Sequence, residues 1–588
     1  MRVSEFQIFN VVLNNLQRSR ADVMKTQEQI STGKRVNRPS DDPVSYNRIM
    51  LDQSANAVAS QRLRNIDFGS QRLDATDGTL NSVNNVLGRL GELSVQMRNA
   101  TIGSDERNAG YSELRQLVQQ LQQLANTSVA GQPLFSGGGI HGRSTGLAIT
   151  APVTLTNGVN DTLVVSVDGV TSGTLDLTSG VEALSGAQLA ARVQARINAD
   201  ATLSAAGKSV NVTFDTDHLV ITSNSSGSSS TVEAVSGTSL SALGLNGGSV
   251  TTGASPYAYR ALTSAASVNT GGATIAQGKI SDPNNVSLND YLIHFTSATT
   301  YDVLNVSAPV AVSPAQANTG GAVMTDAGVR DPSSVDLDNY RIDFTSATQY
   351  TITDTTTSAV VSAGNVYSSG GNIDFRGLRV VLSDGPNGAP KAGDSFTVGL
   401  QPRTVSTGQT YASGGTIAFD GVQVKITNGT GAPAGGDLFR VQTALQYQGD
   451  STVQNIEIGD NQTVKTNLPG SQVFTGPTVD LFASLKSLAS ALTGGYGAGL
   501  DAGIAAITSA QSQVGQAQGE VGALSNRLST TKSALEDAQS FLQTNISQEQ
   551  DADIVKAISD LTLQQTALQA AAQSASTIFS TSLMNFLK

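Results

Sequence analysis

The chain has 588 residues, only 14% of them charged, and a formal net charge of -12. A charged fraction of about 25% is usual, and an acidic balance argues against nucleic acid and anionic membranes as partners, because both require clustered Lys and Arg. The sequence has no cysteine and no apolar run of about 18 residues, so disulfides, thiolate chemistry and membrane insertion are not expected.

The first predicted element is a heptad-patterned helix close to the N-terminus. Its apolar residues recur at Phe9, Leu16, Val23 and Ile30. A seven-residue repeat gives one apolar stripe, which a helix must bury against a second helix. In the polar break that follows, Gly33 can end the helix. Asp42 before Pro43 is typical of an N-cap with proline at the first helical position.

A second helix is predicted from about residue 44 to residue 100, and a third follows the break at Gly103. The second carries apolar residues in heptad register at Ile66, Leu73, Leu80 and Leu87. At 1.5 Å per residue it would be roughly 85 Å long, far beyond an ordinary globular helix. Such a helix needs neighbouring helices along most of its length.

The middle of the chain, from Gly131, is rich in Gly and Thr and alternates like strands, with one short helix predicted at residues 186–199. Residues 290–299 are echoed 49 residues later, and residues 367–380 are echoed 44 residues later. We interpret these repeats as duplicated β-units in one or two outer domains. Deletion of residues 367–410 should then be tolerated far better than any change in the heptads, because the neighbouring unit could replace the lost one.

Helix returns at about residue 479 and continues to residue 546. Its heptad seam consists of Ile507, Val514, Val521, Leu528, Leu535 and Leu542. After a break at residues 547–553, the last helix carries a heptad stripe and a second apolar seam. Neither terminal helix can bury its stripe alone, so the two pair with each other or with neighbouring subunits. The predicted assembly interface comprises Phe9, Leu16, Val23, Ile30, Ile554, Ile558, Leu561, Leu568, Ala575, Phe579 and Phe586.

These elements predict an α+β multidomain chain. Long N- and C-terminal helices form coiled-coil or helical-bundle inner domains, and mainly-β outer domains are inserted between them. The predicted division is 1–42 with 547–588 as a terminal coiled coil that is disordered in the monomer, 43–136 with 479–546 as a long-helix bundle, 137–250 as a strand-rich domain with one short helix, 251–445 as a repeated β domain, and 446–478 as a return segment.

Two sequence features approach catalytic or ligand-binding motifs without fitting them. The segment from Gly137 to Ser144 approaches a phosphate-binding loop, but a helix precedes it and strand-like residues follow, which reverses the required order. The three histidines lack a partner at i+4, where a zinc-binding helix would place one. They are His141, His218 and His294. We therefore predict no catalytic, cofactor-binding or metal-binding residues and expect no enzyme.

Charged residues gather at the two breaks. The acids there are Asp41, Asp42, Asp551 and Asp553. They stand at predicted helix starts, where capping and the helix dipole explain them better than acid–base chemistry does. The bases Lys34, Arg35 and Arg38 form either a solvated loop face or a contact to acidic residues of a neighbouring subunit.

Both ends of the chain resemble the bacterial flagellin superfamily over roughly 140 residues each. The segments that carry the resemblance run from Gln29 to Val44, from Arg64 to Asp67, from Leu114 to Asn126, from Leu134 to Gly137, from Tyr447 to Asp450, from Leu468 to Gly470 and from Asp551 into Leu561–Leu583. Flagellins proper have Asp-Asp-Ala-Ala-Gly after the first helix, whereas this chain has Asp42-Pro43-Val44. That difference favours the branch of proteins at the hook–filament junction, although this chain has a longer middle.

The resemblance implies a non-enzymatic structural subunit of the flagellum that joins hook to filament by helix packing. Expected partners are further copies in a ring, a neighbouring hook-associated protein, flagellin and an export chaperone. Residues 1–16 carry Glu5 and lack an apolar core, so we expect export to the extracellular flagellum without a cleaved signal peptide. The alternatives are flagellin itself, or a secreted binding protein or adhesin acting through its β-repeats.

Overall fold

The computed structural model describes residues 2–99, 103–215, 217–227, 229–246, 249–253, 255–276 and 278–586. The chain divides into two compact units. Unit 1 comprises Met1–Gln71, Asn455–Val464 and Leu524–Lys588, and unit 2 comprises Arg72–Gln454 and Lys465–Ala523. Among the described helices, none is both long and apolar enough to cross a membrane.

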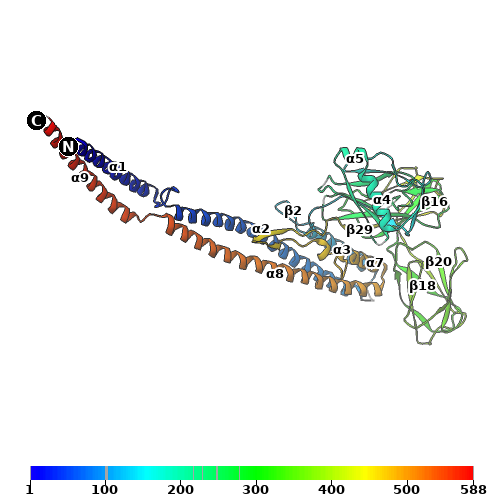
Figure 1. Ribbon diagram of the computed structural model, residues 1–588. Coiled ribbons are helices and arrows are strands. Elements are labelled where there is room, and N and C mark those ends of the chain that lie inside the picture. Colours follow the sequence, from blue (N-terminus) through cyan, green and yellow to red (C-terminus); the bar gives the residue numbers. More distant parts are fainter. Residues whose placement is uncertain are drawn as a thin grey trace. The chain divides into compact units, whose positions relative to one another are not determined.

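Unit 1 is built from the two ends of the chain. Its elements are α1 (Arg2–Thr32), the first half of α2 (Pro43–Met97), the second half of α8 (Gly497–Gln550), α9 (Ile554–Phe586), and a hairpin of β30 (Asn455–Gly459) and β31 (Gln462–Lys465). Helices α1 and α9 lie side by side (Figure 1). Arg62 of α2 binds this hairpin: it donates to Glu457 of β30 at 3.2 Å and forms an ion pair with Asp460 in the turn.

The helical part of unit 2 continues the same two long helices. It adds α3 (Ser104–Ala125), α6 (Gly470–Val473) and α7 (Leu481–Gly494), with a small hairpin of β1 (Ser128–Val129) and β2 (Gln132–Pro133). The heptad residues Leu73, Leu80, Leu87, Ile507, Val514 and Val521 are at most 3% exposed. Asn84 Nδ2 donates to Gln518 Oε1 at 2.7 Å and ties α2 to α8. The prediction of long terminal helices around a mainly-β middle is confirmed.

The first β region of unit 2 has three small sheets packed around one core. Its strands are β3 (Arg143–Ala148), β4 (Val153–Thr156), β5 (Thr162–Val167), β6 (Val170–Thr171), β7 (Leu175–Asp176), β8 (Val181–Leu184), β9 (Val210–Asp215), β10 (His218–Ser223), β11 (Val232–Ser236) and β12 (Ser249–Thr251). The sheet orders are β12-β3-β10-β9, β11-β5-β6 with β7 also paired to β5, and β4-β8. The predicted short helix is α4 (Gly186–Asn198), which a capping box between Ser185 and Gln188 begins, and the five-residue α5 (Ala201–Ala205) follows it.

The second β region is called here the parent unit. Its strands are β13 (Tyr257–Ala265), β14 (Ala273–Ile275), β15 (Lys279–Ile280), β16 (Asp290–Ser297), β17 (Thr300–Asn305), β26 (Arg403–Thr410), β27 (Thr416–Phe419), β28 (Val422–Asn428) and β29 (Leu438–Tyr447). One sheet has the order β13-β29-β16-β17-β26, and the facing sheet joins β14, β15 and β27 to β28. Buried aromatic and aliphatic side chains fill the space between them.

The third β region, called here the inserted unit, interrupts the parent unit between β17 and β26. Its strands are β18 (Val310–Pro314), β19 (Ala322–Val329), β20 (Asn339–Phe344), β21 (Gln349–Asp354), β22 (Val360–Val366), β23 (Asn372–Phe375), β24 (Leu378–Asp384) and β25 (Ser395–Leu400). The sheet order β18-β25-β20-β21-β22 repeats the order of the parent sheet, β13-β29-β16-β17-β26, strand for strand. The duplicates are therefore nested and not consecutive.

This nesting explains the two sequence offsets. Halves of the parent unit that precede and follow the insertion must lie at different distances from their copies. It also shows that our expectation for residues 367–410 is wrong. That segment contains β23, β24 and β25 of the inserted unit and β26 of the parent unit, so its removal would break both folds.

Candidate assembly interface

The two polar breaks of the sequence meet in unit 1 and form an elbow, defined by residues 33–42 and 547–553. Lys34 and Asp551 form an antiparallel bridge. The Arg35 N–H donates to Gln550 O at 2.6 Å, and the Ala552 N–H donates to Gly33 O at 2.9 Å. Gly33 has φ of 69°, the left-handed conformation that ends a helix. The end of α1 and the start of α9 are thereby joined through backbone hydrogen bonds.

Glu549 accepts hydrogen bonds from three polar side chains at the elbow. Its carboxylate accepts from Ser45 Oγ at 2.6 Å and from Arg48 Nη1 at 3.1 Å, and its carbonyl accepts from Arg35 Nη2 at 2.7 Å. The Ser45 hydrogen bond, followed by that of Arg48, lowers the pKa of Glu549. Arg35 also contacts Asp42 at 3.4 Å. Arg35 therefore has partners inside the chain, and so has Arg38, which pairs with Glu28 at 2.9 Å.

Two of the four elbow acids cap helix starts as predicted, and a third accepts from backbone N–H groups of a turn. Asp42 Oδ1 accepts from the Ser45 N–H at 3.1 Å, which begins α2, and Asp553 Oδ1 accepts from the Lys556 N–H at 3.0 Å, which begins α9. Asp41 accepts from the N–H groups of Asn37 and Arg38 in the preceding turn, and these bonds lower its pKa. Asp551 differs, because it follows the end of α8 and accepts from the Ser547 hydroxyl.

The predicted interface residues have very different exposures. Val23 and Ala575 are buried, at 8% and 4% exposed. Four are half-buried, namely Leu16, Ile30, Leu561 and Leu568. Ile554 and Ile558 are 38% and 51% exposed. Phe9, Phe579 and Phe586 lie outside the side chains that the structure describes.

Two residues between α1 and α9 were not predicted. Thr26 and Ala557 are buried, and Thr26 Oγ1 donates to Gln564 Oε1 at 2.9 Å. Thr26 follows Val23 by three positions, the spacing of a second seam. A polar residue and a small one carry too weak an apolar signal to be selected by pattern. A search for a second line of packed residues, three or four positions after each heptad residue, would have identified Thr26 from its distance to Val23.

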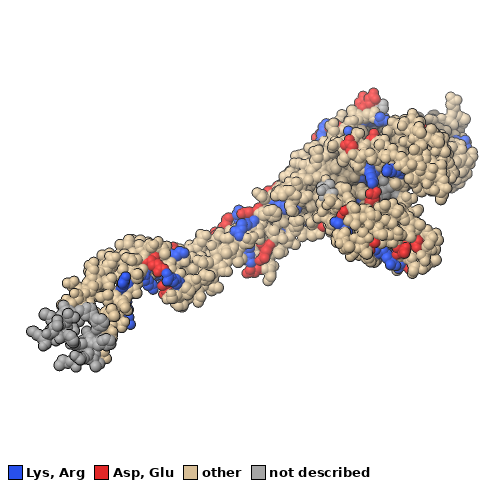
Figure 2. All heavy atoms as spheres, turned by 90° about the horizontal axis from the view of Figure 1, so that it is seen from above, with Lys and Arg blue, Asp and Glu red and all other residues tan. Residues whose placement is uncertain are grey.

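Exposed apolar side chains concentrate in unit 1. This unit holds a quarter of the chain, yet it has thirteen of the twenty-three large apolar side chains that are exposed in the described residues. Every exposed Leu, Ile and Phe among them belongs to it. Along α2, Val44, Leu51 and Val58 are spaced by seven and are 63%, 71% and 46% exposed. In Figure 2 charged residues gather in a few groups, and much of the remaining helical surface is uncharged.

Two of the three histidines and the glycine-rich segment make contacts within unit 2. The Gly138 N–H donates to Asp450 Oδ1 at 2.7 Å, so this loop holds a carboxylate of the chain itself. His141 Nδ1 lies 2.9 Å from Ser225 O, and His218 lies beside Asp217. Within the described residues, no group of three or more His, Cys, Asp or Glu side chains is placed to hold a metal ion.

Comparison with known families assigns the two ends of the chain. The model of the bacterial flagellin N-terminal helical region matches residues 3–139, and that of the flagellin C-terminal helical region matches residues 504–587. The two ends of this chain therefore match the helical regions of bacterial flagellins. In the middle of the chain, residues 313–402 match the D2-like domain of flagellar hook-associated protein 1. That match coincides with most of the inserted unit.

Individual relatives align with this chain over short stretches. Flagellar hook-associated protein 3 of Salmonella typhimurium is 32% identical over 138 residues, which are 23% of this chain and 44% of the relative. The flagellar filament 41 kDa core protein of Borreliella burgdorferi is 33% identical over 112 residues, 19% of this chain and 33% of the relative. The chain thus spans less than half the length of these relatives. The crystal structure of Xanthomonas campestris FlgL is 17% identical, covers 84% of this chain and 99% of its own, and has a TM-score of only 0.28.

Proposed function

We propose that this chain is a non-enzymatic structural subunit of the bacterial flagellum, located at the junction of hook and filament. Its helices pack against those of neighbouring copies and form a ring. The observation that carries the proposal is the concentration of exposed apolar side chains on the helices of unit 1. Soluble monomers rarely expose contiguous apolar surface, and such surface is typical of sites that bind other proteins.

The terminal helices α1 and α9 bury few side chains, which supports the idea that they become ordered only on assembly. Among the described side chains of α1 and α9, only Val23, Thr26, Ala557 and Ala575 are buried. Helices in proteins owe most of their stability to burial of an apolar face, and isolated helices are marginal in water. We infer that α1 and α9 are largely disordered in the monomer, which suits export of an unfolded chain, and that they order on assembly. An export chaperone would cover them until then.

Two observations favour the junction over the filament. The inserted unit matches a domain of a hook-associated protein, and a relative with 32% identity is itself called hook-associated protein 3. Neighbours on the two sides would then be another hook-associated protein and flagellin, outside the cell. Flagellin remains the second candidate, because filament proteins align over the same ends. Copy number separates the two, since a filament needs thousands of subunits and a junction needs one ring.

The test is deletion of the gene followed by electron microscopy and analysis of the culture medium. The junction function predicts hooks that persist without filaments, with flagellin released into the medium. Reintroduction of the intact chain should restore filaments. A deletion strain that still carries normal filaments would refute the junction function, and one that lacks any filament subunit would favour the flagellin alternative.

A further inference from the structure

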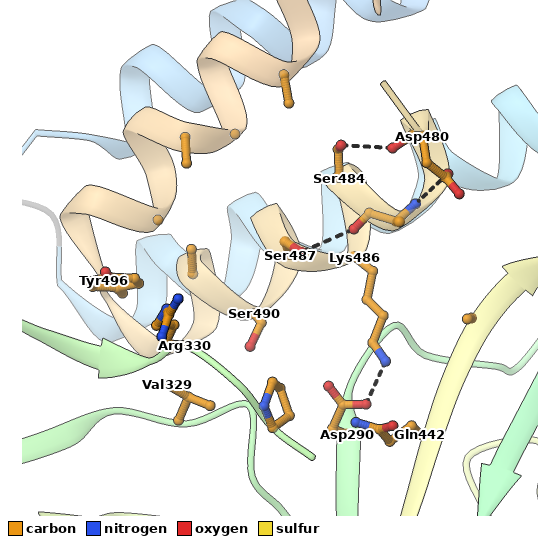
Figure 3. Close-up of a pocket in the computed structure, with 18 of the residues that line it drawn as sticks. Asp290, Val329, Arg330, Gln442, Asp480, Ser484, Lys486, Ser487, Ser490 and Tyr496 are labelled. Atoms are coloured by element: carbon orange, nitrogen blue, oxygen red, sulfur yellow. Dashed lines mark hydrogen bonds and ion pairs between the residues drawn. The ribbon is translucent and has the colours of Figure 1, made fainter. Parts of the chain in front are cut away.

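Unit 2 contains a cavity of about 540 Å³ between the parent sheet, helix α7 and the inserted unit (Figure 3). Small-molecule sites commonly have volumes of about 300–1,000 Å³. The assembly function makes no use of this cavity, which lies in unit 2 and not among the exposed apolar residues of unit 1. Its lining is unusually rich in charged groups for a chain of which 14% is charged.

The floor of the cavity is one face of the parent sheet. Arg260 on β13 is paired in register with Ala444 on β29, and Gln442, two residues before Ala444, is paired with Asp290 on β16. Residues two apart share a face of a strand, so all four line the same side. Strand spacing and rise place the Cα atoms of Arg260 and Asp290 about 12 Å apart. The small side chain of Ala444 leaves the space between them open.

Helix α7 forms a wall of the cavity and presents three serines, each three residues after the last, along one face. Ser484 Oγ donates to Asp480 O at 2.7 Å, and Ser487 Oγ donates to Ala483 O at 3.1 Å. Ser490 Oγ is buried and has no hydrogen-bond partner. A buried hydroxyl without a partner is costly, so a group that fills the cavity would gain by satisfying it.

Asp290 also has unused hydrogen-bonding capacity. The residue is 1% exposed, and its Oδ1 pairs with Lys486 Nζ at 2.6 Å. Its Oδ2 is buried and accepts no hydrogen bond. Burial raises the pKa of Asp290, and Lys486 opposes that shift. In Figure 3 the free oxygen of Asp290 and the hydroxyl of Ser490 both point into the cavity.

Arg260 has no direct hydrogen-bond or ion-pair partner among the described residues, although the charge of Asp480, which also lines the cavity, favours its protonated form. Arg379 at the far wall is held by Asp374, with Nη2 donating to Oδ2 at 2.6 Å, whereas Arg260 makes no hydrogen bond or ion pair among the described residues, and its Nε is buried. Burial lowers the pKa of Arg260. A buried charge that lacks a directly hydrogen-bonded partner destabilises a fold, and such groups are commonly kept where they bind something.

We infer that the cavity binds a small hydroxylated anion, such as a sugar acid or a sugar phosphate. Its acidic group lies on the guanidinium of Arg260, and one of its hydroxyls donates to Asp290 Oδ2 and another approaches Ser490. The site requires both parts of the ligand, because Arg260 and Asp290 stand at opposite ends of the cavity floor.

Ligand-observed NMR on the full chain tests this with defined probes. D-glucuronate and glucose 6-phosphate distinguish carboxylate from phosphate, glucose lacks the charge, and acetate lacks the hydroxyls. At up to about 20 mM these titrations detect millimolar Kd values. We expect saturable binding of at least one of the two hydroxylated anions, and binding of glucose and acetate that is about tenfold weaker or absent. If neither hydroxylated anion binds saturably, the cavity is a hydrated void only and the inference is overturned. Binding of glucose as tight as that of the anions overturns it as well.

Variants locate the binding. Arg260→Met keeps the bulk of the side chain and should weaken binding about tenfold or more, without lowering the melting temperature. Ala444→Leu should fill the cavity and abolish binding. The matched control is Arg440→Met, because Arg440 is also largely buried on β29 but donates to Val335 O at 2.8 Å and does not line the cavity. Binding that survives Arg260→Met, or is lost equally in Arg440→Met, contradicts the assignment.

Discussion

Leu51→Asp should block association and leave the monomer intact. Leu51 is 71% exposed in the middle of the heptad-spaced stripe of α2. Full burial of a leucine contributes about 1.5–3 kcal/mol, so covering the exposed part of Leu51 should contribute about 1–2 kcal/mol. Burial of even a neutral polar group without a hydrogen bond costs about 1–3 kcal/mol, and an ionised aspartate in an apolar contact costs at least as much. The sum corresponds to an association that is about thirtyfold weaker or more.

Sedimentation of the purified chain and incorporation into flagella of a deletion strain measure this effect. The unfolding free energy of the monomer should change by less than about 0.5 kcal/mol, as for other surface substitutions. Gln53→Asp is the matched control, because it adds the same charge at an exposed position outside the stripe. Leu80→Ala, at a fully buried position of α2, should cost about 2–5 kcal/mol in the monomer. Leu51→Asp that associates normally, or destabilises the monomer as Leu80→Ala does, would refute the reasoning.

Three further predictions concern α9, the elbow and the inserted unit. Leu568→Asp should abolish incorporation and barely change the melting temperature of the monomer, whereas a much lower melting temperature would mean that the terminal helices are already packed before assembly. The pKa values of Asp42 and Glu549 are lowered by hydrogen bonds that form in the fold, so their contribution to stability is present above the ordinary values of 3.8 and 4.5 and is lost as the pH falls below them. After correction for the intrinsic pH dependence of amide exchange, protection at residues 33–42 should fall on acidification in the wild type and be lower in Glu549→Ala above the ordinary pKa of Glu549, and protection that is indifferent to pH would contradict this. Replacement of residues 306–402 by Asn-Gly should leave the parent unit folded and the chain able to incorporate, because Asn305 and Arg403 are paired across the sheet and a two-residue turn can join them. A circular dichroism spectrum that shows loss of the parent fold would mean that the parent unit and the inserted unit depend on each other.

The helical ends could be predicted from sequence because their signals are local. Heptad spacing identified Leu73, Leu80 and Val514 as seam residues, and each is fully buried. The Asp42-Pro43 pair located the start of α2 for the same reason, since capping depends on neighbours within three residues. Burial along the terminal helices was harder to predict, because heptad position does not say whether the partner is in the same chain.

The pairing of strands in the β regions could not be predicted from the sequence, for a physical reason. Repeats at 49 and 44 residues reveal duplication, but consecutive and nested units have the same local pattern and differ only in which strands pair. That pairing joins β17 to β26 across the whole inserted unit. The cavity was likewise invisible, because Arg260, Asp290 and Ser490 come from three separate elements and none belongs to a motif.

Electron cryotomography of flagella that carry a tag on this chain tests the central claim most directly. The tag can be placed at the turn of residues 355–359 in the inserted unit, between β21 and β22. The account predicts a single band of density between hook and filament, with no tag along the filament. Tag distributed along the filament would identify a filament subunit, and tag confined to the cell surface would contradict the flagellar account altogether.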